Sequence, residues 1–303
     1  MKAISAALAI STVLLACGAA SSQQTIDANA DVRVARPAFA RGTGPVLAID
    51  AGHHEMGSIA GSYGPMAALA QNDGYRLVSF DKAFAAPALE GVDIVTIANA
   101  RPRPPFDPAQ PGSAFDPTEI EALHAWVEGG GALLLVADHM PFGGSAQALA
   151  QRFGVQFENS FAMPPTQGPE TFSTGNGRLV EGPVSRGAEP GEAVRGVQYF
   201  MGTVLHAPAE ATPLLRLGKG WSIVLPAQPW KFDGAPRRAS NADDLRGAAL
   251  QVGRGRVVVL SEAAMLTAQI DGRGGKAGFN AKGAEGNRQY VLNILHWLSG
   301  RPG

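Results

Sequence analysis

The sequence predicts an α/β protein built on a doubly wound, mostly parallel sheet of the flavodoxin-like type. In the first half of the chain, short apolar runs alternate with amphipathic helical segments, the pattern of strands joined by crossover helices. The runs at 46–49, 93–98 and 132–137 are predominantly apolar, as in strands covered on both faces. Polar residues follow directly where such runs end, and ligands of open α/β sheets bind at this edge.

The first half contains the most regular elements. The clearest is the helix that begins after Asp116, because Pro117 occupies its first position and Glu119 can reach back to the cap. The expected strands cover residues 46–49, 75–80, 93–98 and 132–137, and the expected helices cover 63–72, 117–128 and 145–153.

The second half is less regular and richer in glycine and proline. Long loops are expected over 159–196 and 227–246, where binding residues commonly lie. Two further runs, at 248–252 and 256–260, flank Gly253-Arg254-Gly255 and predict an added β-hairpin. The remaining expected elements are strands at 197–200, 214–217 and 221–225 and a last helix at 285–299.

The N-terminus resembles an export signal. Lys2 precedes an apolar stretch, Ala6 to Leu15, that is too short to span a bilayer. It ends in Leu14-Leu15-Ala16-Cys17, which resembles the lipobox of bacterial lipoproteins, in which the cysteine is lipidated. We therefore expect a signal peptide at 1–16, a lipidated tether at 17–42 and a single α/β domain at 43–303, in the cell envelope on the periplasmic side of an outer membrane. The alternative is cleavage near Ala20, which would release a soluble exported protein.

Composition excludes several classes of function. Cys17 is the only cysteine, so an intrachain disulfide and a cysteine nucleophile in the mature domain are excluded. The formal net charge is −1 and no basic run occurs, which argues against nucleic acid as a partner. The expected partners are the membrane, through the N-terminal lipid, and a small polar ligand or glycan.

Histidine and carboxylate side chains follow three separate strands. If the strands are parallel, their carboxyl ends meet at one edge of the sheet, and these groups then share one cleft. The candidate catalytic residues are His53, Asp138, His139 and Glu262, and the candidate ligand-binding residues are Asp50, His54 and Asn99. The position of Glu262 depends on the direction of the strand at 256–260, because an antiparallel strand would carry Glu262 to the opposite edge of the sheet.

Each candidate also has a purely structural interpretation. His53 and His54 are adjacent and point to opposite sides of an extended segment, so at most one faces the cleft. Asp138 could cap the next helix, and Glu262 could pair with Arg288 of the last helix. Ser145 follows two glycines but lacks the pattern of a nucleophile elbow, and a serine at a helix start is usually an N-cap.

Several motifs together resemble one protein family. They comprise residues 50–54, 63–65, 73–75, 137–144, 261–265 and 287–298. They resemble, over about residues 44 to 300, a family of exported bacterial proteins with a domain of unknown function. That family is grouped with the class I glutamine amidotransferase-like fold, so the resemblance implies this fold but no particular activity. The elbow at 137–140 has neither Cys nor Ser, so glutaminase chemistry is not supported.

Three functions remain open from the sequence. The first is a hydrolase, either with a divalent metal held by the imidazoles and carboxylates or with His139 as base and Glu262 as acid. The second is a non-catalytic module that binds a glycan fragment or another small polar ligand. The third is an accessory scaffold protein that acts through a protein partner. Cofactors, catalysis and oligomeric state are not determined by the sequence.

Overall fold

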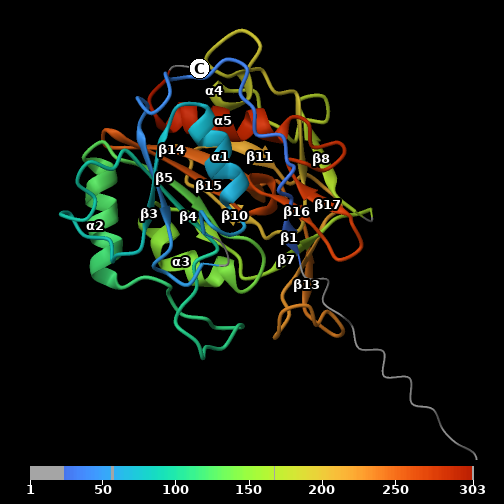
Figure 1. The fold of residues 1–303 in the computed structure, drawn as a ribbon. Coiled ribbons are helices and arrows are strands. Elements are labelled where there is room, and N and C mark those ends of the chain that lie inside the picture. Colours follow the sequence, from blue (N-terminus) through green and yellow to red (C-terminus); the bar gives the residue numbers. More distant parts are fainter. Residues whose placement is uncertain (1–23, 56–57, 167, 302–303) are drawn as a thin grey trace, which may run out of the picture.

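The computed structural model describes residues 24–55, 58–166 and 168–301. Its largest sheet has nine strands, several of which are labelled in Figure 1. In spatial order they are β3 (Arg76–Phe80), β2 (Val46–Asp50), β4 (Ile94–Ala98), β5 (Ala132–Val136), β15 (Gly255–Leu260), β14 (Leu245–Val252), β10 (Leu205–His206) and β6 (Gln156–Phe157), with β11 (Thr212–Arg216) also paired to β14. The expected signal peptide at 1–16 and the lipidation site Cys17 lie outside the described residues.

The predicted doubly wound, mostly parallel sheet is wrong for this chain. Parallel pairing is confined to the five strands from β3 to β15, and the other strands of the main sheet are antiparallel. Eight more strands form small antiparallel sheets: β1 (Thr25–Ile26) with β16 (Ala268–Ile270) and β17 (Lys276–Gly278), β7 (Phe161–Met163) with β12 (Ser222–Val224) and β13 (Arg237–Ala239), and β8 (Glu170–Ser173) with β9 (Gly196–Tyr199). The chain is therefore mostly β, with mixed sheets.

The second half of the chain explains why the sheets are mixed and not mostly parallel. Between residues 156 and 260 the strands are separated by glycine- and proline-containing connections and not by long helices. Antiparallel strands can be joined by short turns, whereas parallel strands need a crossover of a dozen or more residues. The hairpin expected around Gly253 is present, with Val252 opposite Gly255 in β14 and β15.

Helices pack on both faces of the parallel part of the sheet (Figure 1). Alternate residues of β5 enter different cores: Leu134 packs in the cluster that contains α1 and α5, and Leu133 in the one that contains α2 and α3. This alternation is the two-residue period of a strand buried on both faces. The helices are α1 (Gly64–Asn72), α2 (Pro117–Glu128), α3 (Phe142–Arg152), the short α4 (Pro183–Arg186) and α5 (Asn287–Leu298), with a 3₁₀ turn η1 (Ala264–Leu266). Within the described part of the chain, none of the helices combines the length and hydrophobicity needed to cross a bilayer.

The register of the sheet decides which strand ends meet. β15 runs parallel to β5, with Leu260 opposite Val136. Asp138 and Glu262 each follow two residues beyond this pair, so both lie at the carboxyl edge of the parallel strands. β14 runs antiparallel to β5, and the hairpin turns the chain back so that β15 runs parallel to β5. The end of β15 therefore lies at the carboxyl edge of the parallel strands.

Candidate functional site

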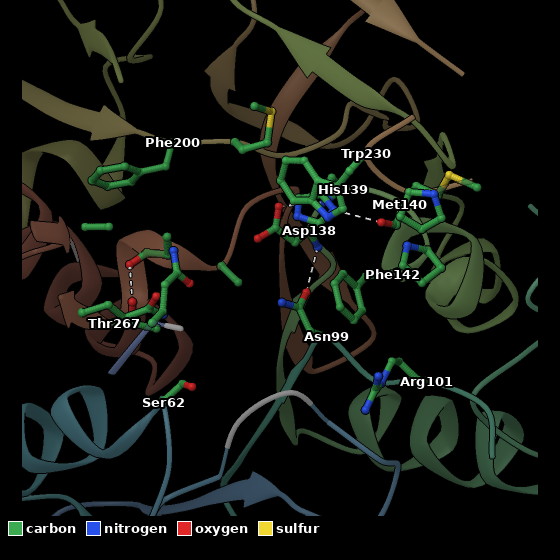
Figure 2. Close-up of a pocket in the computed structure, with 18 of the residues that line it drawn as sticks. Ser62, Asn99, Arg101, Asp138, His139, Met140, Phe142, Phe200, Trp230 and Thr267 are labelled. Atoms are coloured by element: carbon green, nitrogen blue, oxygen red, sulfur yellow. Dashed lines mark hydrogen bonds between the residues drawn. The ribbon is translucent and has the colours of Figure 1, made fainter. Parts of the chain in front are cut away.

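A pocket of about 490 Å³ opens at the carboxyl edge of β4, β5 and β15 (Figure 2). Its volume lies in the range of small-molecule sites, which is roughly 300–1,000 Å³. Polar and aromatic side chains share its wall. They include Ser62, Tyr63, Asn99, Arg101, Asp138, His139, Phe142, Phe200, Trp230, Thr267 and Gln269.

Asn99 follows β4 and has a left-handed backbone, with a φ of 59°. Its Oδ1 accepts a hydrogen bond from the backbone N–H of Asp138 (2.9 Å), and its own N–H donates to the Val136 carbonyl (3.0 Å). Non-glycine residues in this conformation are uncommon and often lie at functional sites. Asn99 thus joins the ends of β4 and β5, and within the described residues its Nδ2 is left without a partner in the pocket wall.

His139 presents one ring nitrogen to the pocket. Its Nδ1 lies 2.8 Å from the Met140 carbonyl oxygen, which can only accept, so Nδ1 carries the proton. In the neutral ring Nε2 is then an acceptor or base, and no described residue hydrogen-bonds to it. The ring is held by stacking on Phe161 (4.6 Å between centroids) and by an edge contact with Trp230 (4.7 Å).

Trp230 forms the aromatic rim of the pocket. Its side chain is 57% exposed, and its backbone has a φ of 67°. It also contacts Phe161 at 5.0 Å between centroids, so it is both exposed and fixed in position. A large exposed aromatic side chain beside a pocket that also contains polar groups is typical of binding surfaces, where its flat face contacts a ligand.

Glu262 lies behind the pocket wall and is fully buried. Its carboxylate accepts hydrogen bonds from the backbone N–H groups of Ala264 and Met265 at the start of η1, and Ala264 itself lines the pocket. The expected alternative partner, Arg288, pairs instead with Asp31 (2.8 Å).

Burial also controls the protonation of the two carboxyl groups at this edge. Desolvation, followed by the nearby charge of Asp138, raises the pKa of Glu262 well above its ordinary value. Desolvation likewise raises the pKa of Asp138, although His139 opposes the shift. Because each carboxyl disfavours ionisation of the other, the two groups titrate as a coupled pair.

We expect Glu262→Gln to stabilise the protein increasingly as the pH rises above 4.5, the ordinary value for this group. A carboxyl whose pKa is raised by folding contributes stability that is fully present below the unfolded value and is lost as the pH rises through the folded value. Gln has the shape of the protonated acid and avoids this loss. Melting temperatures of both proteins should agree at low pH and diverge at neutral pH; a variant that is less stable at neutral pH would contradict the assignment.

His53 does not line this pocket. Its Nδ1 contacts Asp50 (2.8 Å), its Nε2 contacts Glu119 of α2 (3.0 Å), and its ring stacks on Phe84 (4.9 Å). Burial alone would lower the pKa of His53, but hydrogen bonds and charges of Asp50 and then Glu119 raise it to about 9. The structure therefore brings Asp138 and His139 together, with Glu262 directly behind them, and places His53 in a separate cluster.

Asp50 and His54 also lie outside the pocket wall. Asp50 is buried against His53. His54 contributes its carbonyl oxygen, which accepts a hydrogen bond from Nε of Arg101 (3.1 Å). His54 has a φ of 50°, so its backbone is left-handed like that of Asn99.

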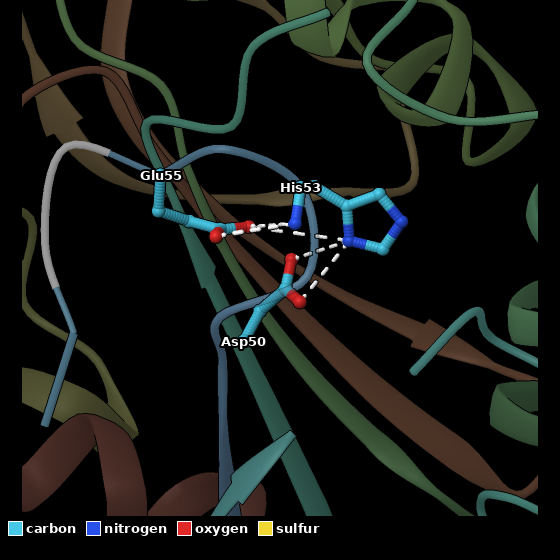
Figure 3. A group of neighbouring side chains, drawn as sticks. All are labelled: Asp50, His53 and Glu55. Carbon is cyan, nitrogen blue, oxygen red and sulfur yellow. Dashed lines mark hydrogen bonds and ion pairs between the residues drawn. The ribbon is translucent and has the colours of Figure 1, made fainter. Parts of the chain in front are cut away.

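Sequence reasoning did not select three residues that the structure places at these sites. Arg101 lines the pocket, and Glu119 contacts His53 Nε2. Glu55 lies beside His53 and Asp50 (Figure 3). Desolvation and then contact with Asp50 raise the pKa of Glu55 to about 9. Glu55 directly follows the two histidines and could have been found from that position. The contact of Glu119 with His53 was not predicted, because helix capping already accounted for a glutamate at this position.

No protein-family model matches the chain, and no curated protein matches it significantly. Among solved structures, the mmIFT52 N-terminal domain superposes with a TM-score of 0.58 at 16% identity, covering 84% of this chain and 97% of that one. This similarity shows a shared fold and nothing about function.

Two other solved structures are less similar. A ThuA-like protein from Bacteroides uniformis has a TM-score of 0.45 at 13% identity, covering 89% of this chain and 94% of that one. A β-galactosidase from Bacillus circulans has a TM-score of 0.43 at 12% identity, covering 84% of this chain and 30% of that one. Neither score establishes a common fold, so the glutamine amidotransferase-like assignment stays a prediction.

Proposed function

We propose that the pocket beside Asp138 and His139 binds a small polar ligand with an apolar face, such as a sugar unit of a glycan. The observation that carries this proposal is the exposed Trp230 at the rim of a pocket whose wall combines apolar surface with polar side chains. An aromatic ring can pack against the C–H face of a sugar, while hydroxyl groups need hydrogen-bonding partners on the other side.

The polar side chains of the pocket wall supply such partners. Within the described residues, Nδ2 of Asn99 is a free donor and Nε2 of His139 is a free acceptor, and both residues line the pocket. Arg101 adds a fixed positive charge, which hydrogen-bonds to the His54 carbonyl and leaves other guanidinium donors for a ligand. Donors, an acceptor and an aromatic surface around one cavity favour a neutral or weakly anionic polyol over an apolar molecule.

A ligand screen tests this proposal. Thermal-shift measurements would be made with neutral sugars, uronic acids, amino sugars and apolar compounds of similar size, followed by calorimetric titration of the hits. We expect stabilisation by members of the sugar classes and weaker binding to His139→Ala. If apolar compounds bind and sugars do not, or if binding is unchanged in His139→Ala, the proposal is wrong.

Hydrolysis of the bound ligand is a second candidate function. It is favoured by the fixed tautomer of His139, which leaves Nε2 free to act as a base, and by the raised pKa of Asp138, which shifts this group toward its protonated form. In this scheme His139 activates water and Asp138 protonates the leaving group. Product formation that is lost in both His139→Gln and Asp138→Asn would support catalysis, whereas binding without turnover supports the non-catalytic module.

We also propose that the protein is exported and held at the cell envelope through a lipid on Cys17. The lipobox-like sequence supports this. Gln24 lines the pocket and follows Cys17 by seven residues, so an anchored chain would hold the pocket within about 25 Å of the bilayer.

The anchor is tested by Cys17→Ser. We expect this change to remove incorporation of a fatty-acid probe and to release the protein from the membrane fraction, because it removes the only thiol in the chain. Ser21→Ala, four residues away, serves as the control and should remain labelled. Cys17-independent labelling, or no labelling of the wild type, would contradict lipidation.

A further inference from the structure

A second group of potential ligand atoms lies outside the pocket, at the last residue of β2 and on the loop that follows it. Asp50, His53 and Glu55 each offer an oxygen or nitrogen atom, and these atoms all lie within 4.8 Å of one another (Figure 3). The His53 Nδ1 atom is 2.8 Å from Asp50 Oδ2 and 4.0 Å from Glu55 Oε1. Ligands held about 2.1 Å from a common ion lie at most about 4.2 Å apart, so these two spacings fit one ion.

Glu119 determines which nitrogen of His53 faces this group. Its Oε1 lies 3.0 Å from His53 Nε2 and also accepts from the Phe84 N–H, while its Oε2 accepts from the Asp116 N–H. A carboxylate that is fixed by backbone donors requires Nε2 to carry a proton, and Nδ1 faces Asp50 and Glu55. A metal ion bound at Nδ1 would displace the proton that Nδ1 shares with Asp50 in the metal-free chain. A carboxylate on the far nitrogen of a histidine is the usual arrangement behind a metal-binding imidazole.

Within the described part of the chain, His53 is the one side chain that can offer this cluster a positive charge. Three carboxylates, Asp50, Glu55 and Glu119, surround one imidazole, and their side chains are 0%, 3% and 10% exposed. Among the described residues, none of the three forms an ion pair with a lysine or arginine. Buried carboxylates are costly unless they are paired, protonated or bound to a metal.

Elsewhere the same protein neutralises a similar group with its own cation. Glu158, His206 and Asp244 also lie close enough to hold an ion. There the guanidinium of Arg238 contacts both carboxylates, at 2.8 Å from Asp244 Oδ2 and 3.1 Å from Glu158 Oε1. That position is occupied by the arginine, so the Glu158 group offers an internal comparison that should not bind metal.

We propose that Asp50, Glu55 and the Nδ1 atom of His53 bind one divalent transition-metal ion, with Glu119 as the positioning residue. One imidazole with two carboxylates suits Zn²⁺ or Mn²⁺ better than Ca²⁺ or Mg²⁺, which prefer oxygen ligands alone. Water completes the coordination. The site is separate from the pocket and does not depend on the function proposed for it.

Metal titration of the chelator-treated full chain tests the proposal. We expect one equivalent of Zn²⁺ to bind in calorimetry, Co²⁺ to give a visible absorption band at the same stoichiometry, and Mg²⁺ not to compete. Glu55→Gln should weaken Zn²⁺ binding at least tenfold, because it removes a charged ligand oxygen but keeps the shape of the side chain.

Two histidine variants serve as matched controls. His54→Gln changes the neighbouring imidazole, and His206→Gln changes the imidazole of the arginine-filled cluster; neither should alter Zn²⁺ affinity or the Co²⁺ spectrum. Melting curves of the metal-free variants show whether each is folded, and His53→Gln gives a second ligand variant if Glu55→Gln is not. Absence of stoichiometric binding, unchanged affinity in a folded Glu55→Gln or His53→Gln protein, or loss of binding in His206→Gln would overturn the proposal.

Discussion

Leu134→Asp is expected to leave no folded protein. Leu134 is fully buried in β5, where it lies between Thr96 of β4 and Val258 of β15. An unpaired charge at this position has neither a partner nor water, and its cost of several kcal/mol is comparable to the roughly 5–15 kcal/mol that stabilises a typical domain. Circular dichroism and solubility of the purified variant measure the outcome.

The matched control is Val78→Asp. Val78 lies in β3 at the edge of the same sheet and is 38% exposed, so its carboxylate can reach water. We expect this variant to fold with a melting temperature close to that of the wild type. A soluble Leu134→Asp protein that melts at the wild-type temperature would contradict the central position of β5.

Trp230→Ala is expected to weaken ligand binding about 30-fold, equivalent to about 2 kcal/mol, because a well-packed aromatic contact can carry much of the energy of a small interface. Since the side chain is 57% exposed, the fold should survive its removal. Calorimetric titration with a sugar identified by the screen measures the loss.

Trp126→Ala provides the comparison, since Trp126 lies on α2 and does not line the pocket. Its affinity for the same ligand should equal that of the wild type. Equal ligand affinities of Trp230→Ala and the wild type would show that Trp230 does not contribute to binding. Equal losses of affinity in both tryptophan variants would indicate a general effect of lower stability.

Local sequence patterns predicted the elements of the first half well. The apolar runs at 46–49, 93–98 and 132–137 are the adjacent strands β2, β4 and β5, and the capping residues place the start of α2 at Pro117. These signals depend on neighbouring residues alone. The overall class was not predicted, because the short strands after residue 155 pair according to contacts between distant segments, which the sequence pattern does not reveal.

The candidate site shows the same division. Polar residues at the ends of β4 and β5 could be read from the sequence, and Asn99, Asp138 and His139 do meet in one pocket. The orientation of His53 could not be read, because it depends on Glu119, which is 66 residues away. Glu262 reaches the expected edge of the sheet. Its burial behind Ala263 and Ala264 follows from the 3₁₀ turn η1, which no local sequence pattern predicted.

Histidine-resolved NMR tests the central claim, that the pocket beside Asp138 and His139 is the ligand-binding site. The chain has six histidines, so a protein labelled with ¹⁵N-histidine gives a small set of signals that single substitutions can assign. On addition of a sugar identified by the screen, we expect a saturable shift of the His139 ring nitrogens, with His124 and His206 unchanged. A ligand that binds while the His139 signals stay in place, and that shifts those of His206 or His124 instead, would contradict it.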